Sequence, residues 1–388
     1  MDRSLRDGRH WLQQQMLPGG RVRGDRDVNS FGKPIWGLWS AGAPRAVIKR
    51  LLDHLAAKAV QPNGDLGFAA EVKTHPAGLG LYRSLYCLIV AAATDHPLAR
   101  NRRIRQRLQQ YQDARTGAVY GLIGHDPAAP QPNPFHAALL TSTSVHAFLG
   151  LGMPDRAVRS GEWLARLVRL NRTHMRRDGL FYFQMDLKAR LITAVPPNRN
   201  WTHVLSNAKP KQQFFQTGAI MAALARLADS LLSRRRPDRA RARKFLEAAF
   251  ELLRFEQTML AEGYEWPQKC KIAWGGGDLL TTALRHRRAS PEQLLALYRA
   301  TRATVVSTFF DSQRPDGSWG GDSIPLQDNA PEFDYDYKLL RGQSNAPLRP
   351  TGSKTCAWAQ PIEITGEFLG EIAVARRGIS FLIKSLEK

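Results

Sequence analysis

Residues 312–322 read SQRPDGSWGGD, and they place a Pro-Asp-Gly turn between a helical segment that ends near Phe310 and a tryptophan, Trp319. Proline fixes φ, aspartate caps its own turn, and Gly317 supplies a positive φ. The same order of turn, glycine and then an aromatic or aliphatic residue recurs at residues 17–22, 62–68, 115–120, 177–182 and, more loosely, 261–266. Six such turns in one chain indicate a repeat architecture.

Each turn follows an amphipathic segment and precedes a more apolar one that is rich in Gly, Ala and Ser. The amphipathic segments begin near residues 5, 44, 97, 154, 237 and 291, and the apolar ones cover about 33–39, 79–93, 135–151, 212–232, 272–284 and 362–386. Hydrophobic positions at helical spacing predict twelve helices. One closed arrangement that buries the apolar helices is an inner ring of six apolar helices inside an outer ring of six amphipathic ones. The sequence therefore predicts an all-α fold, an (α/α)6 toroid in which residues 1–388 form one domain.

Composition excludes several classes of protein. Hydrophobic residues make up 43% of the chain, which is enough for a large core, but no run of 18 apolar residues could span a membrane. The charged N-terminus lacks the apolar stretch of a signal peptide. Cys87, Cys270 and Cys356 are widely separated, so they indicate neither a zinc knuckle nor a disulfide framework. These features favour a cytoplasmic protein with free thiols.

The formal net charge of +22 is the outlier of the composition, and much of it is concentrated in residues 100–107, 234–236 and 239–244. Such runs are often only a solvated face, but they can also bind an anionic partner. In the predicted toroid they fall mainly where an inner helix leads to an outer one. We expect them to bind a partner there, such as an acidic carrier protein, and we do not expect that partner to be a nucleic acid.

One segment carries a family resemblance. Residues 302–319 contain Arg302 on a helix, then Phe309, Phe310 and Gln313, and they end with DGSW at 316–319. This segment resembles the QW repeat of squalene-hopene and related terpenoid cyclases. Residues 11–20 are a weaker version. The resemblance implies the α/α toroid that these cyclases share with protein prenyltransferases. As architecture it covers the whole chain, but its specific motif covers only residues 302–319.

The chain departs from the chemistry of both families. It has no DxDD acid motif, and the nearest sequence is DYDY at 334–337. It also lacks the Asp-x-Cys pair that helps to bind zinc in protein prenyltransferases, and a DDxxD motif for magnesium. Toroids of this kind also host glycoside hydrolases, polysaccharide lyases and sugar epimerases, so the fold alone does not fix the reaction.

Carboxylates and one histidine are the candidate acid–base groups. Asp334 and Asp336 lie in the long irregular stretch 320–360, where neighbouring tyrosines could raise a carboxyl pKa, although a solvated acidic loop is the plainer interpretation. Glu363, Glu367 and Glu371 are spaced by four on the last helix and so share a face. Glu367 would point into the ring if Gly366 marks a close helix contact. His203, in a polar loop, is an alternative base.

Aromatic and polar residues of the apolar helices are the candidate substrate-binding groups, although most aromatics at such spacings are ordinary core. They are Trp36, Tyr82, His146, Gln212, Phe215, Gln216, Trp274, Asp278 and Trp319. Three glycines at 275–277 cost about 1 kcal/mol each in a helix interior, so they predict a close approach of backbone or ligand. No histidine pair has metal-ligand spacing, so we expect neither a metal nor a cofactor.

Three functional hypotheses follow. The leading one is a cofactor-independent cyclase, isomerase or lyase of specialised metabolism, which acts by acid–base chemistry on a largely apolar, terpenoid- or polyketide-like small molecule in the toroid cavity. The second is a carbohydrate-active toroid, a lyase or hydrolase of an anionic sugar. The third is a non-enzymatic scaffold whose basic face binds an acidic partner.

Overall fold

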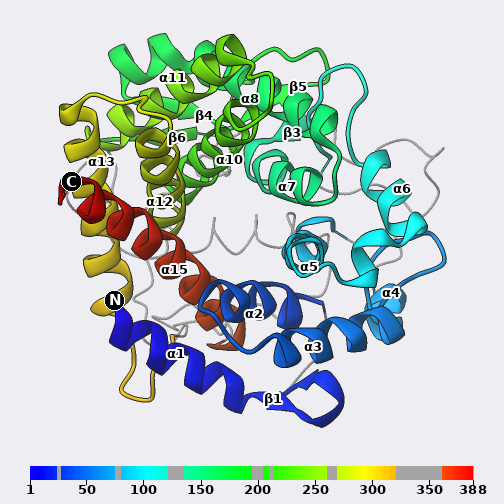
Figure 1. Cartoon of the computed structure of the whole chain (residues 1–388). Coiled ribbons are helices and arrows are strands. Elements are labelled where there is room, and N and C mark those ends of the chain that lie inside the picture. The colour runs from blue at the N-terminus through cyan, green and yellow to red at the C-terminus, as the bar shows by residue number, and fades with distance from the viewer. Residues whose placement is uncertain are drawn as a thin grey trace, which may run out of the picture.

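Two concentric layers of helices surround a central space in the computed structural model (Figure 1). The structure describes residues 1–23, 28–74, 80–120, 135–194, 204–208, 214–259, 269–319 and 361–387. Within these ranges the inner layer consists of α2 (Asn29–Ser40), α5 (Tyr82–Ala93), α7 (Ala138–Gly150), α10 (Phe215–Leu232), α12 (Cys270–Arg285) and α15 (Pro361–Leu386). Each of these helices packs on the next, and α15 packs on α2, so the inner layer closes into a ring.

The outer layer alternates with the inner one along the chain. It consists of α1 (Asp2–Gln14), α3 (Arg45–Lys58), α6 (Arg102–Gln110), α8 (Pro154–Thr173), α11 (Arg239–Glu256) and α13 (Pro291–Thr304), and a short helix, α4 (Ala69–Thr74), precedes α5. The predicted order of outer and inner helices is thus confirmed, and the fold is an (α/α)6 toroid. No described helix is both long and apolar enough to cross a membrane.

Two predicted helices have the expected position but differ from the expectation in detail. The segment from Pro97 is a 3-10 turn (Pro97–Arg100) before α6, because the side chain of Asn101 accepts hydrogen bonds from the backbone nitrogens of Arg103 and Ile104 and starts a new helix. Residues Val305–Phe310 continue α13 as a π-helix. The predicted bounds of the other helices differ from the observed ones by only a few residues at most ends.

Small antiparallel strand pairs, which the sequence pattern did not predict, join some of the helices. They are β1 (Met16–Leu17) with β2 (Arg21–Val22), β3 (Phe135–Ala137) with β5 (Gln184–Asp186), and β4 (Leu180–Tyr182) with β6 (Val204–Ser206). Phe135 pairs with Asp186 and Leu180 with Ser206. Strands of two or three residues are too short to show the alternating pattern that identifies a strand in a sequence.

The glycine turns fasten one outer helix to the next. The turn glycines Gly19, Gly64, Gly117, Gly179 and Gly317 all have positive φ, while the sixth, Gly263, lies outside the described residues. A Cβ on Gly64 would lie 2.3 Å from the carbonyl oxygen of Arg103 on α6, and one on Gly317 would lie 2.6 Å from that of Asp7 on α1. Only glycine permits these contacts, and the contact of Gly317 with α1 closes the outer ring.

In each of two of these turns, a glutamine side chain donates hydrogen bonds to the turn and to the neighbouring outer helix. The Nε2 of Gln313 donates to the carbonyl oxygens of Gly317 (2.9 Å) and of Ser4 on α1 (3.1 Å). The Nε2 of Gln112 donates to the carbonyl oxygens of Gly117 (3.1 Å) and of Arg156 on α8 (2.9 Å). The glutamine of the QW-like segment is therefore a structural link between repeats.

Glycines also let the inner helices approach closely. A Cβ on Gly275 would lie 2.4 Å from the carbonyl oxygen of Gly218, and one on Gly277 would lie 2.5 Å from that of Val374. The close approach predicted for residues 275–277 is therefore confirmed as contact of α12 with α10 and α15. Gly366 likewise lies against Pro34, because an added Cβ would be 2.4 Å from the Pro34 nitrogen. This brings α15 against α2 and fixes where Glu367 points.

Candidate functional site

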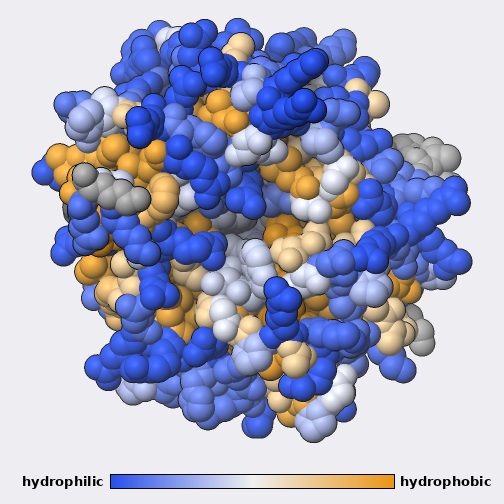
Figure 2. Space-filling model, in the orientation of Figure 1, coloured by the Kyte–Doolittle hydropathy of each residue, from blue (hydrophilic) through white to orange (hydrophobic). Residues whose placement is uncertain are grey.

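The inner helices present their side chains to the central space, here called the lumen, in layers one helical turn apart. Near the start of five inner helices lie Lys33, Tyr82, Phe215, Lys271 and Glu367, and about one turn further along lie Trp36, Tyr86, Trp274 and Glu371. Residues three or four apart share a face of a helix, so each pair points the same way. Figure 2 shows the surface hollowed at the centre of the ring.

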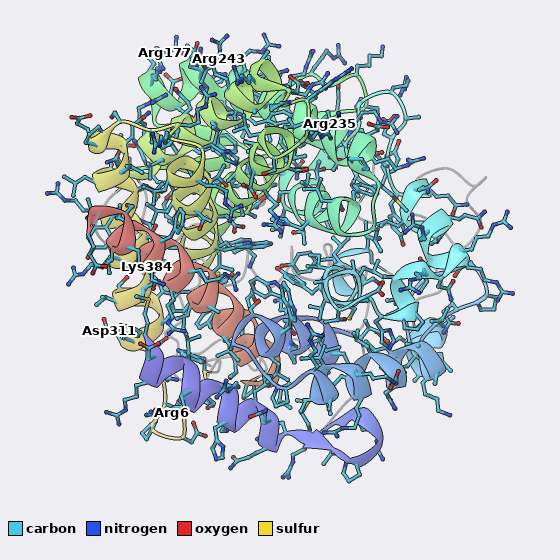
Figure 3. The ribbon with its side chains drawn as sticks, viewed as in Figure 1. Arg6, Arg177, Arg235, Arg243, Asp311 and Lys384 are labelled. Atoms are coloured by element: carbon cyan, nitrogen blue, oxygen red, sulfur yellow. The ribbon has the colours of Figure 1, made fainter. Side chains whose placement is uncertain are left out.

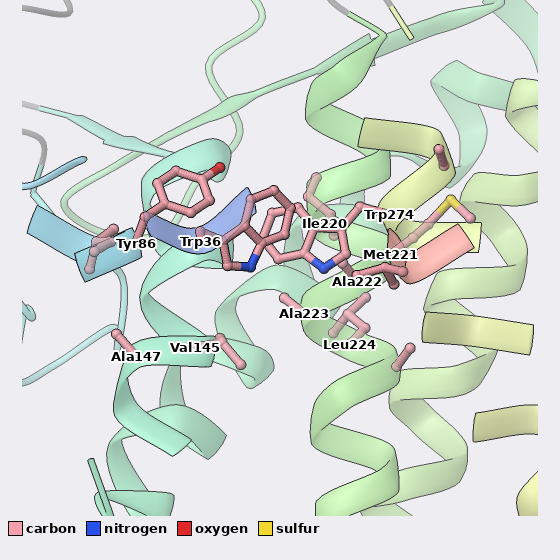
Figure 4. Packing of buried hydrophobic residues seen from close by; sticks show 14 of the residues in the cluster. Trp36, Tyr86, Val145, Ala147, Ile220, Met221, Ala222, Ala223, Leu224 and Trp274 are labelled. Atoms are coloured by element: carbon pink, nitrogen blue, oxygen red, sulfur yellow. The ribbon is translucent and has the colours of Figure 1, made fainter. Parts of the chain in front are cut away.

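Aromatic rings cross the lumen in the deeper layer (Figure 4). The ring centroids of Trp36 and Trp274 are 5.1 Å apart, those of Trp36 and Tyr86 are 5.2 Å apart, and that of His146 lies 4.7 Å from Trp274. Trp36, Tyr86 and Trp274 are each 3% exposed or less. These four residues, called the aromatic layer below, come from α2, α5, α7 and α12, so they form a wall that joins opposite sides of the ring.

Five ionisable side chains, called the lumen cluster below, lie beside this layer: Lys33, Lys271, Glu363, Glu367 and Glu371. The Nζ of Lys33 lies 2.9 Å from Glu363 Oε1 and 2.6 Å from Glu367 Oε2. Lys271 hydrogen-bonds to the other oxygen of Glu367. Lys33 also lies over the ring of Tyr82 and Lys271 over that of Phe215. These contacts join side chains from α2, α5, α10, α12 and α15.

The geometry keeps Glu367 and both lysines charged. Burial by itself would lower the pKa of Lys33, but the carboxylates of Glu363 and Glu367 outweigh it and hold that pKa above its ordinary value. The pKa of Lys271 is likewise raised well above its ordinary value against burial, with Cys270 and Glu367 as the largest opposing influences. Burial acts to raise the pKa of Glu367, but Lys271 and Lys33 lower it to about 2.

Glu371 has the opposite character. Its side chain is 0% exposed, and neither carboxyl oxygen has a hydrogen-bond partner among the described residues, although the Nζ of Lys271 lies 3.5 Å from Oε1. Burial raises the pKa of Glu371 to about 8; the charge of Glu367 also raises it, and Lys271 opposes the rise. Two carboxyls one turn apart on α15 therefore differ at neutral pH, since Glu367 is ionised and Glu371 is protonated. Such a divergence is typical of acid–base sites.

Cys270, Glu367 and Glu371 form a set that could hold a metal ion, because their ligand atoms lie within 4.8 Å of one another. The arrangement does not fit a metal well, because the ammonium group of Lys271 is already among them, 3.9 Å from the Cys270 sulfur. Burial also raises the pKa of the Cys270 thiol well above its usual value, so the thiol is protonated when no metal is bound. Among the described residues, the cation beside these three side chains is the ammonium of Lys271.

A further polar layer lies one turn beyond Trp274. The indole nitrogen of Trp274 donates to Asp278 Oδ2 at 3.0 Å. Burial raises the pKa of Asp278 and lowers that of His146 to about 3, so the imidazole is neutral at physiological pH. The Nε2 of His146 is buried without a hydrogen-bond partner among the described residues. His146 is therefore a neutral member of the aromatic wall.

The structure brings together most of the described residues that the sequence analysis named. Trp36, Tyr82, His146, Phe215, Trp274, Asp278 and Glu367 lie on the lumen side of inner helices, and the buried Gln216 follows Phe215 at the start of α10. Trp319 lies apart from them. It is 0% exposed, packs against Phe368 and Gly8, and donates its indole N–H to the carbonyl oxygen of Phe309, so its surroundings are those of a packing residue between α1, α13 and α15.

The other named residues, Asp334, Asp336, His203 and Gln212, lie outside the described residues. Sequence reasoning missed Lys33, Lys271 and Tyr86 and did not single out Glu371 from its two neighbours on α15. A signal was present, because Lys271 is a lone charge in the apolar run CKIAWGGG at 270–277. A lysine within an apolar inner helix is rarely buried unless a carboxylate pairs with it.

Comparison with known proteins supports the fold but not the reaction. No protein family model and no curated protein sequence matches the chain. Solved structures that resemble it include a D-mannose isomerase, with 11% identity over 96% of this chain and 97% of that one and a TM-score of 0.58. A family 88 glycosyl hydrolase from Bacteroides vulgatus has 13% identity over 98% and 99% of the two chains and a TM-score of 0.54. The type II terpene cyclase MstE from Scytonema has 12% identity over 97% and 98%, with a TM-score of 0.52. At such identities the likeness shows a shared toroid fold.

Proposed function

We propose that this protein is an enzyme that cyclises, isomerises or eliminates from a largely apolar, carbonyl-bearing small molecule by acid–base chemistry in the toroid lumen. The observation that carries the proposal is Glu371, a buried carboxyl group beside a lysine and an aromatic wall. A carboxyl with a pKa of about 8 holds its proton at neutral pH and is therefore available as a general acid. The structural neighbours include a cyclase, an isomerase and a hydrolase, which supports an enzymatic role.

The two lysines favour a substrate that develops negative rather than positive charge beside them. Lys33 and Lys271 keep their protons, so a carbocation formed next to them would be repelled, whereas a carbonyl oxygen that gains negative charge would be stabilised. This argues for a carbonyl-bearing, polyketide-like compound over a pure hydrocarbon chain. Trp36, Trp274 and Phe215 would contact its apolar part.

In the proposed reaction Glu371 donates its proton to the carbonyl oxygen while a base removes a proton from the adjacent carbon, which gives an enol. The new carboxylate of Glu371 then lies 3.5 Å from the ammonium of Lys271, which stabilises it. Glu367 is a poor base because the two lysines lower its pKa to about 2, so its carboxylate has little affinity for a proton. Asp334, Asp336 and His203 remain our candidates for the base, and no metal or cofactor enters the scheme.

A carbohydrate-active role is the second candidate. A protonated and an ionised carboxyl on one helix are the pair that glycoside hydrolysis needs, and tryptophans stack on sugar rings. The neighbours described as a glycosyl hydrolase and a D-mannose isomerase lend it support. Against it, Glu367 is already bound by two lysines, which leaves it a weak nucleophile or base.

One experiment separates these hypotheses. Purified wild-type protein and the variant Glu371→Gln, which keeps the shape of the side chain but cannot supply the acid proton, are incubated with fractionated small-molecule extracts and compared by untargeted mass spectrometry. We expect compounds that the wild type consumes at least ~10²-fold faster than the variant, because general acid catalysis contributes about 10²–10⁴-fold. The matched control, Glu387→Gln on the exposed C-terminus, should behave as the wild type.

The mass of the product identifies the reaction class. An unchanged mass supports a cyclase or isomerase, two fragments that sum to the substrate mass support a lyase, and fragments that have gained water would replace our proposal with the hydrolase. Equal turnover by wild type and Glu371→Gln would show that Glu371 is not the acid. No consumption by either protein, together with partner binding that depends on surface arginines, would favour the non-enzymatic scaffold.

A further inference from the structure

A groove on the outer wall of the toroid gathers positive charge far from the lumen. It lies between α8, α11 and α13, encloses about 420 Å³, and is lined by Arg172, Arg176, Arg239, Arg243, Arg254 and Arg288. We call it the arginine groove. Two glutamates, Glu247 and Glu251, also line it, so six arginines face two carboxylates and leave a formal surplus of four positive charges. Figure 3 shows Arg243 at this edge of the ring.

The buried side chain of Glu251 holds two arginines of the groove in place. Its carboxylate is 3% exposed and accepts hydrogen bonds from Arg176 Nε at 2.9 Å, from Arg176 Nη2 at 3.0 Å, and from Arg254. Burial acts to raise the pKa of Glu251, but these arginines lower it below its usual value, so it is ionised and holds both guanidinium groups in place. The side chains of Arg176 and Arg254 remain more than half exposed.

The other arginines of the groove are less engaged. Arg239 and Arg288 make no ion pair with any residue that the structure describes, and Arg243 reaches only Glu247, at 3.7 Å between exposed side chains. The planar guanidinium group carries several N–H donors in a fixed arrangement, which suits it to bidentate hydrogen bonding with a carboxylate or a phosphate. Arg176 and Arg254, which Glu251 holds in place, are therefore prearranged for contact with an anion.

Two features favour carboxylates on a protein over the phosphates of a nucleic acid. The wall of the groove includes the apolar side chains of Leu232, Leu246 and Phe250, which an acidic peptide with interspersed apolar residues would contact. Glu247 and Glu251 would repel a closely spaced row of phosphates, whereas separate carboxylates can pair with individual arginines.

The charge continues beyond the groove along the same two helices. A second hollow between α8, α11 and the loops beside them, of about 460 Å³, is lined by Arg166, Arg169 and Lys244 among others, with Glu162 as its acidic residue. Arg169 lies about one helical turn from Arg172 on α8, and Lys244 follows Arg243 on α11, so the two hollows adjoin the same two helices. We call the two hollows together the basic strip. We propose that this strip docks an acidic segment of a partner protein, with the arginine groove as its centre.

Binding of a defined peptide tests the proposal without reference to enzyme activity. The probe is a fluorescein-labelled peptide of repeated Glu-Glu-Leu, measured by fluorescence anisotropy at low salt against wild-type protein and the variant Arg243→Glu/Arg288→Glu. The matched control, Arg3→Glu/Arg6→Glu, makes the same change of net charge on α1, where the side chains are 89% and 68% exposed and where Figure 3 shows Arg6 well away from Arg243. A peptide of repeated Gln-Gln-Leu and a single-stranded oligothymidylate of equal length are the other ligands.

We expect the groove variant to weaken binding of the acidic peptide at least ~10-fold and the α1 control to change it less than about twofold, because charge reversal acts most on ions in direct contact. The Gln-Gln-Leu peptide should not bind. Equal losses in the two variants would show a response to total charge and overturn the proposal, as would an absence of peptide binding by the wild type. Tighter binding of oligothymidylate that depends on Arg243 and Arg288 would assign the strip to a nucleic acid.

Discussion

The lumen cluster and the arginine groove both concentrate ionic side chains, but they do so under opposite physical conditions. In the lumen two lysines and three glutamates are 12% exposed or less, and their charges balance when Glu371 keeps its proton. In the groove six arginines outnumber two glutamates, and most of them face water. Buried charges must be neutralised by neighbours or by protonation, whereas solvent screens exposed ones. A surplus of positive charge is therefore tolerated in the groove, whereas the charges in the lumen must balance.

The largest stability effect should follow from the lumen. Replacing Lys271 by Met leaves Glu367 with only Lys33 and leaves Glu371 without its ammonium, so we expect unfolding to become easier by about 3–5 kcal/mol, as when one partner of a buried ion pair is removed. Denaturant unfolding followed by circular dichroism measures this. Lys384→Met, at an exposed site near the end of α15, should change stability by no more than about 0.5 kcal/mol.

A double variant sharpens this test. If the cost of Lys271→Met arises from uncompensated carboxylate charge, then Lys271→Met/Glu367→Gln should regain part of the lost stability. If the double variant is less stable than Lys271→Met, then the cost arises from packing, and the contrast between the two regions would lose its electrostatic basis.

An intermediate effect is expected in the pH dependence of stability. The pKa of Glu371 is raised from its ordinary value of 4.5 to about 8, so between these values the folded state binds more protons than the unfolded state. By linkage this group makes the free energy of unfolding fall as pH rises through that interval, by up to about 1.4 kcal/mol per pH unit. Glu256, whose pKa burial raises to about 7, acts in the same direction.

Comparison of wild type with Glu371→Gln isolates this contribution. The variant should lose stability less steeply than the wild type between about pH 5 and pH 8, as measured by urea unfolding at several pH values. Identical slopes for the two proteins would mean that Glu371 ionises in the folded state as it does in the unfolded one. A carboxyl in the lumen would then titrate like one on the surface.

The smallest effect should come from the groove. Arg243 is 76% exposed, and among the described residues its ion-pair partner is Glu247, whereas Arg288 has no ion pair there. We expect Arg243→Gln/Arg288→Gln to change the free energy of unfolding by less than about 0.5 kcal/mol in thermal or urea unfolding, since exposed ion pairs contribute little. A loss of more than about 2 kcal/mol would show that these arginines hold α11 and α13 in place.

Much of this architecture could be predicted because it follows from local sequence patterns. Turn glycines with positive φ, helical spacing of apolar residues and the cost of three consecutive glycines are properties of short stretches, and the toroid follows from their repetition. The candidate site was predicted less completely. Trp36, Tyr82, Trp274 and Glu367 were identified from residue type and helical face, but Lys33 and Lys271 were not, since their partners lie 330 and 96 residues away.

The sequence by itself thus determined the alternation of outer and inner helices, the turns that link them and the face of α15 that carries three glutamates. Tertiary structure alone decided that Gly366 brings α15 against Pro34, that both lysines meet Glu367, and that Glu371 is left in a space where it keeps its proton. The physical reason is that periodicity and turn chemistry act between near neighbours in the chain, whereas a pKa depends on burial and on charges that only folding brings together.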